Sequence, residues 1–330
     1  NRNKKSVSLD LKSPEGRDIL LELVQTADGL LENFRPGTLE RMGIGPDILL
    51  EANPQLVITR ISGWGQTGPY AELPGFGTLA EAVSGFMHRN GSADRPPAPP
   101  PTALADMVAG LYAATATIAA VLHARGGGAG QTIDVSLFEP LASMMGPDAL
   151  LYQLGRLPKR GEGTRASSVK GVFLTADDQW VALSAGAERI VRDLFTAIDA
   201  MDLLDDPRFA GYEGRLDHRA EINEVIGRWI EQRDGDEVVK TLRSQGVTIA
   251  PVLSTGDARE DPHFIAREVY VDMPGRDGEP DRIAMHNVVP RLSGTPSGMR
   301  RPAPRLGEHN DELLAELGIS AETRRDLARR

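Results

Sequence analysis

Cysteine is absent from this chain of 330 residues, and so are several sequence signatures of common catalytic sites. Without cysteine there can be no disulfide, no thiolate nucleophile and no Cys-ligated metal. No P-loop and no G-x-S-x-G elbow occur, which argues against P-loop NTPase chemistry and against a Ser-His-Asp hydrolase. The six histidines form no H-x-x-x-H pair, so we expect no metal site.

Basic charge and long apolar runs are also scarce. The formal net charge is −10 and the pI is about 5.2, an acidic balance that argues against a nucleic-acid partner. The most apolar run, from Met107 to Leu122, is shorter than the roughly 20 residues that a membrane span needs, and the first residues do not form a signal peptide. We therefore expect a cytoplasmic protein without a membrane partner. The chain opens without Met, close to a predicted strand at Ser6–Leu11, and we expect an N-terminal portion to be missing.

Strand and helix patterns alternate along the first half of the chain. Predicted strands at Gly29–Glu32, Leu56–Ser62 and Gln131–Val135 are separated by helical stretches. This alternation is typical of an α/β unit with a parallel sheet. Further on, Val172–Thr175 and Trp180–Ser184 flank a short polar turn and predict a β-hairpin.

These patterns predict a division into domains. We expect a large, Rossmann-like α/β domain over residues 1–160 and a small α+β domain over residues 161–249. Residues 250–330 are expected to form a return segment and C-terminal helices that pack on the large domain.

Asp106 is the main candidate for a catalytic group. The prolines at 99–101 exclude regular helix before it, and the small residues after it predict a long helix. Asp106 should therefore lie at or next to a helix N-cap, where unpaired N–H groups and the helix dipole favour the ionised carboxylate. Most aspartates before a helix are structural caps only, so position alone leaves both roles open.

The segment after the first predicted strand lies where ligands of open α/β sheets bind. Arg35 and Arg41 offer positive charge for phosphates. Asn33 offers an amide, and Phe34 and Met42 offer apolar surface to a ring. This mixture suits a nucleotide with phosphates, and composition alone is equally compatible with a solvated turn.

Several segments have an order and spacing that are specific and span nearly the whole chain. They are NRNKKSVSLDLKSPEG, ADGLLENFRPGTLERMGIG, NPQLVITRISGWGQTGPY, PTALADMVAG, GQTIDVSLFEP, DDPRF and RLGEHNDELLAELG. Taken together, these segments resemble the family III CoA-transferases of the CaiB/BaiF type, which include formyl-CoA transferase and L-carnitine CoA-transferase. The resemblance implies an enzyme that transfers CoA between an acyl-CoA and a free carboxylic acid, with no tightly bound cofactor. It also implies an interlocked homodimer and the absence of the family's first strand–helix unit.

The resemblance implies roles for particular residues. The family's catalytic aspartate falls on Asp106, whose carboxylate would form an acyl-aspartyl anhydride and then an aspartyl-CoA thioester. The substrate loop falls on Phe76 and Gly77. The CoA-contacting positions fall on Leu9, Lys12, Asn33, Phe34, Arg41 and Met42.

Two segments depart from the family pattern and leave the acyl specificity open. Residues 74–77 replace a loop that often carries Tyr with an adjacent acid, and residues 160–165 replace a Gly-rich loop. The related α-methylacyl-CoA racemases carry His where Phe76 stands, and racemisation needs two acid/base groups. A racemase-type isomerase is therefore an alternative with weaker support, and a catalytically silent CoA-binding homologue is another.

Overall fold

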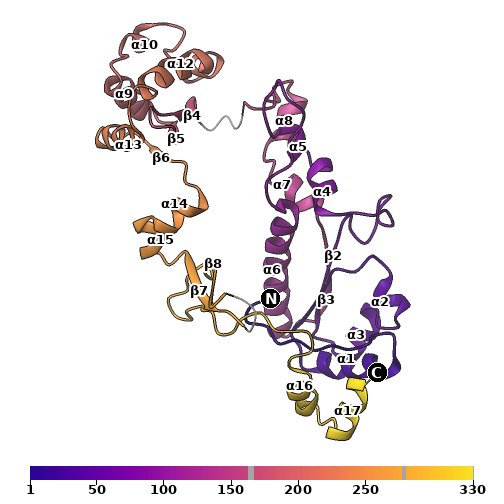
Figure 1. The fold of residues 1–330 in the computed structure, drawn as a ribbon. Coiled ribbons are helices and arrows are strands. Elements are labelled where there is room, and N and C mark those ends of the chain that lie inside the picture. The colour runs from indigo at the N-terminus through magenta and orange to yellow at the C-terminus, as the bar shows by residue number, and fades with distance from the viewer. Residues whose placement is uncertain (163–166, 277–279, 330) are drawn as a thin grey trace. The chain divides into compact units, whose positions relative to one another are not determined.

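The computed structural model describes residues 1–162, 167–276 and 280–329. Its chain contacts divide it into two compact units, Asn1–Gly163 with Arg301–Arg330, and Thr164–Arg300 (Figure 1). The sequence predicts a return segment and C-terminal helices over residues 250–330; of this range, Arg301–Arg330 belongs to the first unit.

The first unit contains a three-stranded parallel sheet in the order β1-β2-β3. Gly29 of β1 pairs with Val57 of β2, and Val57 pairs with Gln131 of β3, so the first residues of the three strands lie side by side. The prediction of an α/β fold with a parallel sheet is confirmed. The strands are β1 (Gly29–Glu32), β2 (Val57–Ser62) and β3 (Gln131–Ser136).

The central strand β2 is buried on both faces, because successive side chains of a strand point to opposite sides. Ile58 belongs to a core formed with helices of one face. Thr59 points to the other face, where its Oγ1 lies 2.6 Å from Thr117 Oγ1 of α6. Figure 1 shows α6 running alongside β3 and β2. The helices are α1 (Pro14–Gln25), α2 (Thr38–Arg41) and α3 (Pro46–Ala52) on the first face and α6 (Leu104–Arg125) on the second.

Helix α6 packs through alanines at 105, 109, 113, 120 and 124. It has 22 residues, more than the apolar run seen in the sequence, because it starts at Leu104. Within the described residues it is the one helix long and apolar enough to cross a membrane, with 28% of its most apolar window buried. The expectation that this segment is too short for a span is therefore wrong on length, although the core helix of a soluble protein meets the same criteria.

The remaining helices of the first unit are short. Two of them lie within residues 137–154, where Gly146 with φ of 63° and Pro147 separate one from the other. The short helices of the first unit are α4 (Gly77–Val83), α5 (Phe86–Arg89), α7 (Phe138–Ser143), α8 (Asp148–Gln153), α16 (Asn310–Glu316) and α17 (Ala321–Arg329).

The N-terminal segment joins the C-terminal one. Ser6 N–H donates to His309 Nδ1 at 3.1 Å, and Ser8 N–H donates to Asn310 Oδ1 at 2.8 Å. The predicted strand at Ser6–Leu11 is wrong, since its backbone is bonded to side chains of this segment and no sheet includes it.

The second unit has an antiparallel sheet in the order β4-β5-β6, which confirms the predicted hairpin. Helices pack around one apolar core that includes Phe195, Ile222, Ile226 and Leu242. A separate hairpin, β7–β8, follows. The strands are β4 (Val169–Leu174), β5 (Trp180–Ala185), β6 (Ile249–Pro251), β7 (Tyr270–Pro274) and β8 (Arg282–His286). The helices are α9 (Glu188–Ala197), α10 (Asp202–Asp205), α11 (Tyr212–Asp217), α12 (Arg219–Ile230), α13 (Gly235–Ser244), α14 (Thr255–Glu260) and α15 (Pro262–Ala266).

Candidate active site

Asp106 lies in the first turn of α6, and its side chain is exposed. It is the third residue of the helix and not its cap, because the helix begins at Leu104 after Ala103. Ala103 offers no capping side chain. Glu81 of α4, only 3% exposed, accepts a hydrogen bond from the Ala105 N–H at 3.2 Å. A neighbouring helix therefore supplies the polar partner at the end of α6 that carries Asp106.

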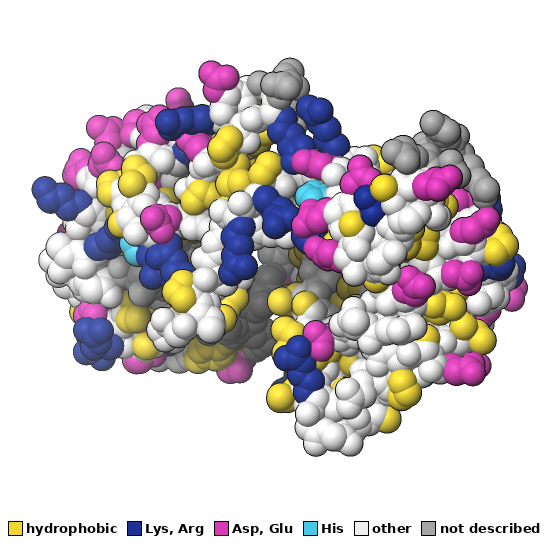
Figure 2. Space-filling view, turned by 90° about the horizontal axis from the view of Figure 1, so that it is seen from below, with side chains coloured by type: hydrophobic (Ala, Val, Ile, Leu, Met, Phe, Trp, Pro, Cys, Tyr) yellow, Lys and Arg dark blue, Asp and Glu magenta, His cyan; other side chains and the backbone are white. Residues whose placement is uncertain are grey.

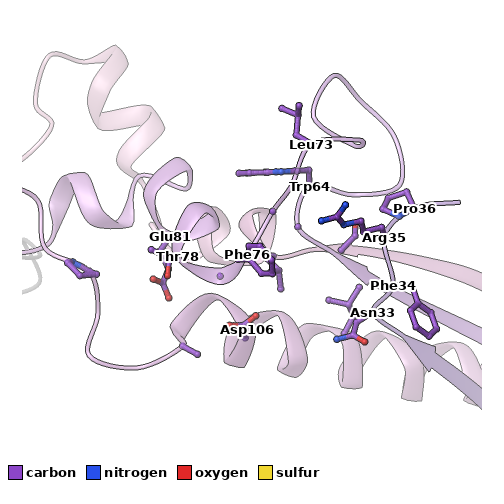
Figure 3. A pocket seen from close by; sticks show the side chains of 18 of the residues that line it. Asn33, Phe34, Arg35, Pro36, Trp64, Leu73, Phe76, Thr78, Glu81 and Asp106 are labelled. Atoms are coloured by element: carbon purple, nitrogen blue, oxygen red, sulfur yellow. The ribbon is translucent and has the colours of Figure 1, made fainter. Parts of the chain in front are cut away.

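Gly77, the first residue of α4, lies directly against Asp106. A Cβ at Gly77 would lie 2.5 Å from Asp106 Oδ2, so only glycine fits without a shift of the carboxylate. Phe76, the preceding residue, is 70% exposed. In Figure 3, Phe76 and Asp106 face the same space.

The loop that precedes α4 is held by Trp64. The indole Nε1 donates to Pro74 O at 3.2 Å, and a Cβ at Gly75 would lie 2.7 Å from that same nitrogen. Asp134 of β3 in turn holds the segment that contains Trp64, because its Oδ2 accepts a hydrogen bond from the Gln66 N–H at 2.9 Å. The loop before α4 is thus linked to the sheet through Trp64 and Asp134.

A cavity of about 690 Å³ lies over this part of the first unit. Its volume falls in the range of sites for small molecules and cofactors. Figure 3 shows Glu81 and Phe34 toward opposite ends of the view, with Asp106 between them. Among the residues that line it are Asn33, Phe34, Arg35, Trp64, Leu73, Phe76, Gly77, Glu81 and Asp106.

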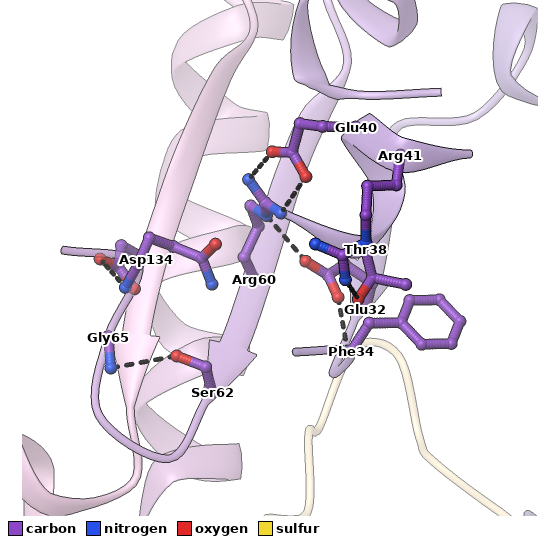
Figure 4. Close-up of polar contacts among 10 residues, drawn as sticks. Glu32, Phe34, Thr38, Glu40, Arg41, Arg60, Ser62, Gly65 and Asp134 are labelled. Carbon is purple, nitrogen blue, oxygen red and sulfur yellow. Dashed lines mark hydrogen bonds and ion pairs between the residues drawn. The ribbon is translucent and has the colours of Figure 1, made fainter. Parts of the chain in front are cut away.

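The segment after β1 is tied to the sheet by an ion-pair network centred on the buried Arg60 (Figure 4). Arg60 of β2 donates from Nε to Glu32 Oε1 at 2.7 Å and from Nη1 to Glu40 Oε1 at 2.7 Å. Glu32 Oε2 accepts from the Phe34 N–H at 2.7 Å. The hydrogen bond from Arg60 lowers the pKa of Glu40, so this carboxyl group stays charged at neutral pH.

A second cavity, of about 300 Å³, is lined mainly by basic side chains. Lys12, Arg17 and Arg41 line it together with Thr38 and Met42. Arg17 Nη1 donates to Met42 O at 3.1 Å, and Arg41 Nη2 donates to Thr38 Oγ1 at 2.9 Å. Three cations around one hollow are suited to phosphate groups.

A family model described as CoA-transferase family III matches residues 1–310 of this chain. The chain belongs to this family. It is therefore a CoA-transferase, an enzyme that moves coenzyme A between an acyl-CoA thioester and a carboxylic acid.

Curated and solved relatives agree with the family. The chain is 36% identical over 318 residues to succinyl-CoA–D-citramalate CoA-transferase of Chloroflexus aurantiacus, covering 96% of this chain and 79% of that protein. It is 33% identical to succinate–glutarate CoA-transferase of Agrobacterium fabrum, covering 96% and 79%. A crystal structure of a CaiB/BaiF family protein from Brucella suis superposes with a TM-score of 0.81 at 31% identity, covering 96% and 82%.

In this CoA-transferase, all but one of the residues predicted from the sequence line one of the two cavities. Lys12, Arg41 and Met42 line the basic cavity, and Leu9 lines neither cavity. The larger cavity brings together Asp106, Asn33, Phe34, Phe76 and Gly77.

Sequence reasoning missed Arg17, Glu81 and Arg60. Each acts on a partner far along the chain, and no local motif marks it; the Arg60 contact to Glu32 spans 28 residues. The altered loop at residues 160–165 is described only in part, since 163–166 lie outside the described residues. Its Arg160 donates to His88 O at 2.9 Å.

Among the described residues, no group of three or more His, Asp or Glu side chains is arranged to hold a metal ion.

Proposed function

We propose that Asp106 is the nucleophile of CoA transfer and carries both the acyl group and CoA in turn. The observation that supports this most is the position of its carboxylate, which lines the larger cavity beside Phe76 and Gly77. The first turn of a helix is a favourable place for negative charge, and a carboxylate nucleophile needs no general base.

The proposed chemistry runs in two symmetrical halves. A carboxylate oxygen of Asp106 attacks the thioester carbon of the donor, the C–S bond breaks, and an acyl-aspartyl anhydride and CoA thiolate form. The thiolate attacks the aspartyl carbonyl and releases the donor acid, leaving aspartyl-CoA. The acceptor carboxylate then attacks aspartyl-CoA and expels the thiolate, which takes the acceptor acyl group from the second anhydride. Asp106 returns to its starting state.

We assign CoA to the two cavities of the first unit. Lys12 and Arg41 pair with its phosphates, because they are cations at the basic cavity. Phe34 and Met42 offer apolar surface to the adenine or the pantetheine arm, with Asn33 as an amide partner. Leu9, which is partly buried, is kept as a weaker contact.

We propose succinyl-CoA as donor and a short dicarboxylic acid as acceptor. The names of the relatives support this choice, since they pair succinyl-CoA or succinate with citramalate, malate or glutarate. We propose that the enzyme works without a tightly bound cofactor, because exchange between thioester and anhydride needs no redox step. We also propose a cytoplasmic location.

We also propose a homodimer that covers the free side of α6. Met107, Leu111, Ile118 and Leu122 are spaced along one helix face and are 66–73% exposed in the single chain. An apolar stripe of this length is costly in water, and a second copy of the chain is the partner that the family resemblance implies.

The nucleophile is tested with Asp106→Asn, which keeps the shape and removes the charge. Exchange of labelled succinate into succinyl-CoA should fall by at least about 10³-fold. During turnover, hydroxylamine should convert the wild-type Asp106 to its hydroxamate, detectable by peptide mass spectrometry. Retained exchange in Asp106→Asn would refute the assignment, and deuterium uptake at the α-carbon of an acyl-CoA would favour a racemase instead.

A further inference from the structure

Arg60 is the one charged residue of strand β2. It is 6% exposed, and the rest of the strand consists of the apolar Val57, Ile58 and Ile61 and the uncharged hydroxyl residues at 59 and 62. Its guanidinium group donates to the carboxylates of Glu32 and Glu40, and a further bond runs from Nη2 to Glu40 Oε2 at 3.2 Å. The Arg60 side chain therefore forms a fork, with one arm to Glu32 and the other to Glu40.

Stability alone does not account for such a group. Taking a charged pair out of water costs several kcal/mol, and apolar residues of similar size often serve a core equally well or better. What the charged fork does provide is geometry, since Arg binds carboxylates in a fixed planar arrangement that Lys cannot reproduce.

One arm of the fork reaches the segment after β1. Glu32 is the last residue of β1 and is 6% exposed. Its Oε1 takes the bond from Arg60 while its Oε2 takes the Phe34 N–H. Figure 4 shows this chain of contacts from strand to loop. Arg60 thus controls the orientation of the carboxylate that holds the backbone of Phe34.

The other arm reaches α2. This helix has four residues, and a helix of one turn has little stability of its own. Glu40 lies within it, next to Arg41, so the double contact with Arg60 anchors the helix that presents Arg41 and Met42 to the basic cavity.

We propose that Arg60 is a positioning residue that holds the two halves of the CoA site in one geometry, Asn33–Phe34 on one arm and Arg41–Met42 on the other. It touches neither CoA nor the reacting atoms. The inference rests on the proposed function, in which those four residues contact CoA.

The test uses Arg60→Lys, which keeps a buried positive charge and loses the fork. The dissociation constant of CoA, measured by calorimetry, and the KM for succinyl-CoA should each rise about tenfold. The kcat and the KM for the acid should change less than about twofold, because Asp106 is held by α6 and α4. A purely structural residue would lower the active fraction and leave both KM values unchanged.

The matched control is Arg89→Lys. Arg89 forms another ion pair of low exposure, from Nη1 to Asp148 Oδ2 at 2.5 Å, and neither residue lines the two cavities. It should lower the unfolding temperature without changing CoA affinity.

A second variant covers the case in which Arg60→Lys fails to fold. Glu40→Gln changes a half-exposed side chain and weakens only the α2 arm, so CoA affinity should fall by about threefold with normal folding. Unchanged CoA affinity in folded Arg60→Lys or Glu40→Gln overturns the inference while the proposed function stands. Absence of CoA binding in the wild type overturns the proposed function itself.

Discussion

At the scale of single residues, the contact between Gly77 and Asp106 decides what the site can do. The carboxylate fits because position 77 has no Cβ, and Glu81 supports the helix end from behind. Both contacts constrain the orientation of the Asp106 carboxylate in the larger cavity.

Gly77→Ala should reduce turnover far more than stability. The new Cβ would meet Asp106 Oδ2 at 2.5 Å, and a carboxylate displaced by about 1 Å can cost on the order of 10²-fold in rate. The kcat for CoA exchange is the readout, with the unfolding temperature measured in parallel. Gly294→Ala is the control, since nothing lies within 4 Å of a Cβ there. Equal kcat in the two variants would contradict the role of this contact.

Glu81→Ala should destabilise the first unit by roughly 1–3 kcal/mol, because the Ala105 N–H loses its acceptor in a buried place. Glu81 is 3% exposed, and the bond is 3.2 Å long. Urea unfolding measures the change. Glu81→Gln keeps an acceptor oxygen and should lose less than half as much; the idea fails if the two variants lose the same free energy of unfolding.

At the scale of elements, α6 has two different faces. The alanine face packs into the first unit, and the face carrying Met107, Leu111, Ile118 and Leu122 is open in the single chain. The short helices α4 and α7 pack beside its first half, where Asp106 lies. One helix therefore serves the site with one end and the proposed partner copy with its open side.

Ile118→Lys should shift the protein from dimer to monomer. A charge on a side chain that is 69% exposed costs little in an isolated chain and several kcal/mol at an apolar interface. Light scattering in detergent-free buffer gives the mass. Val172→Lys, at another exposed apolar side chain, should leave the dimer intact. An unchanged dimer in Ile118→Lys, or a wild type that is monomeric and sediments with lipid vesicles, would disprove the proposed interface.

At the scale of the whole molecule, acidic and basic groups are interspersed, as the face in Figure 2 shows. Six carboxyl groups spread over both units have partners that lower their pKa values. The largest cause in each case is a side-chain hydrogen bond. The bonds come from Arg60, Thr175, Arg208, His218, Ser254 and Lys5 and act on Glu40, Asp177, Asp206, Glu221, Asp257 and Glu312 respectively.

Stability should therefore decline in acid and not near neutrality. A carboxyl group whose pKa is lower in the folded than in the unfolded chain stabilises the fold above its ordinary pKa, and this contribution disappears as the pH falls through the folded-state value. The ordinary values are near 4, so the unfolding temperature should be flat from about pH 6 to 8 and fall below about pH 4. A steep change between pH 6 and 8 would point to histidine and contradict this prediction.

The sequence by itself determined the family, the parallel sheet and the β4–β5 hairpin. These follow from local signals: apolar runs of strand length, turn residues between them, and segments whose order is specific. It also singled out Asp106 and the Asn33–Phe34 segment, because a proline-bounded helix start and a strand end are visible in the chain itself.

Only the tertiary structure decided how those residues meet. The Gly77–Asp106 contact, the Glu81 bond to α6 and the Arg60 fork join positions 20 or more residues apart, and no local pattern encodes such pairs. The same holds for the N-terminal segment, which reads as a strand and instead bonds to His309 and Asn310. Backbone groups take whichever partner packing brings within reach, and local propensity does not set that choice.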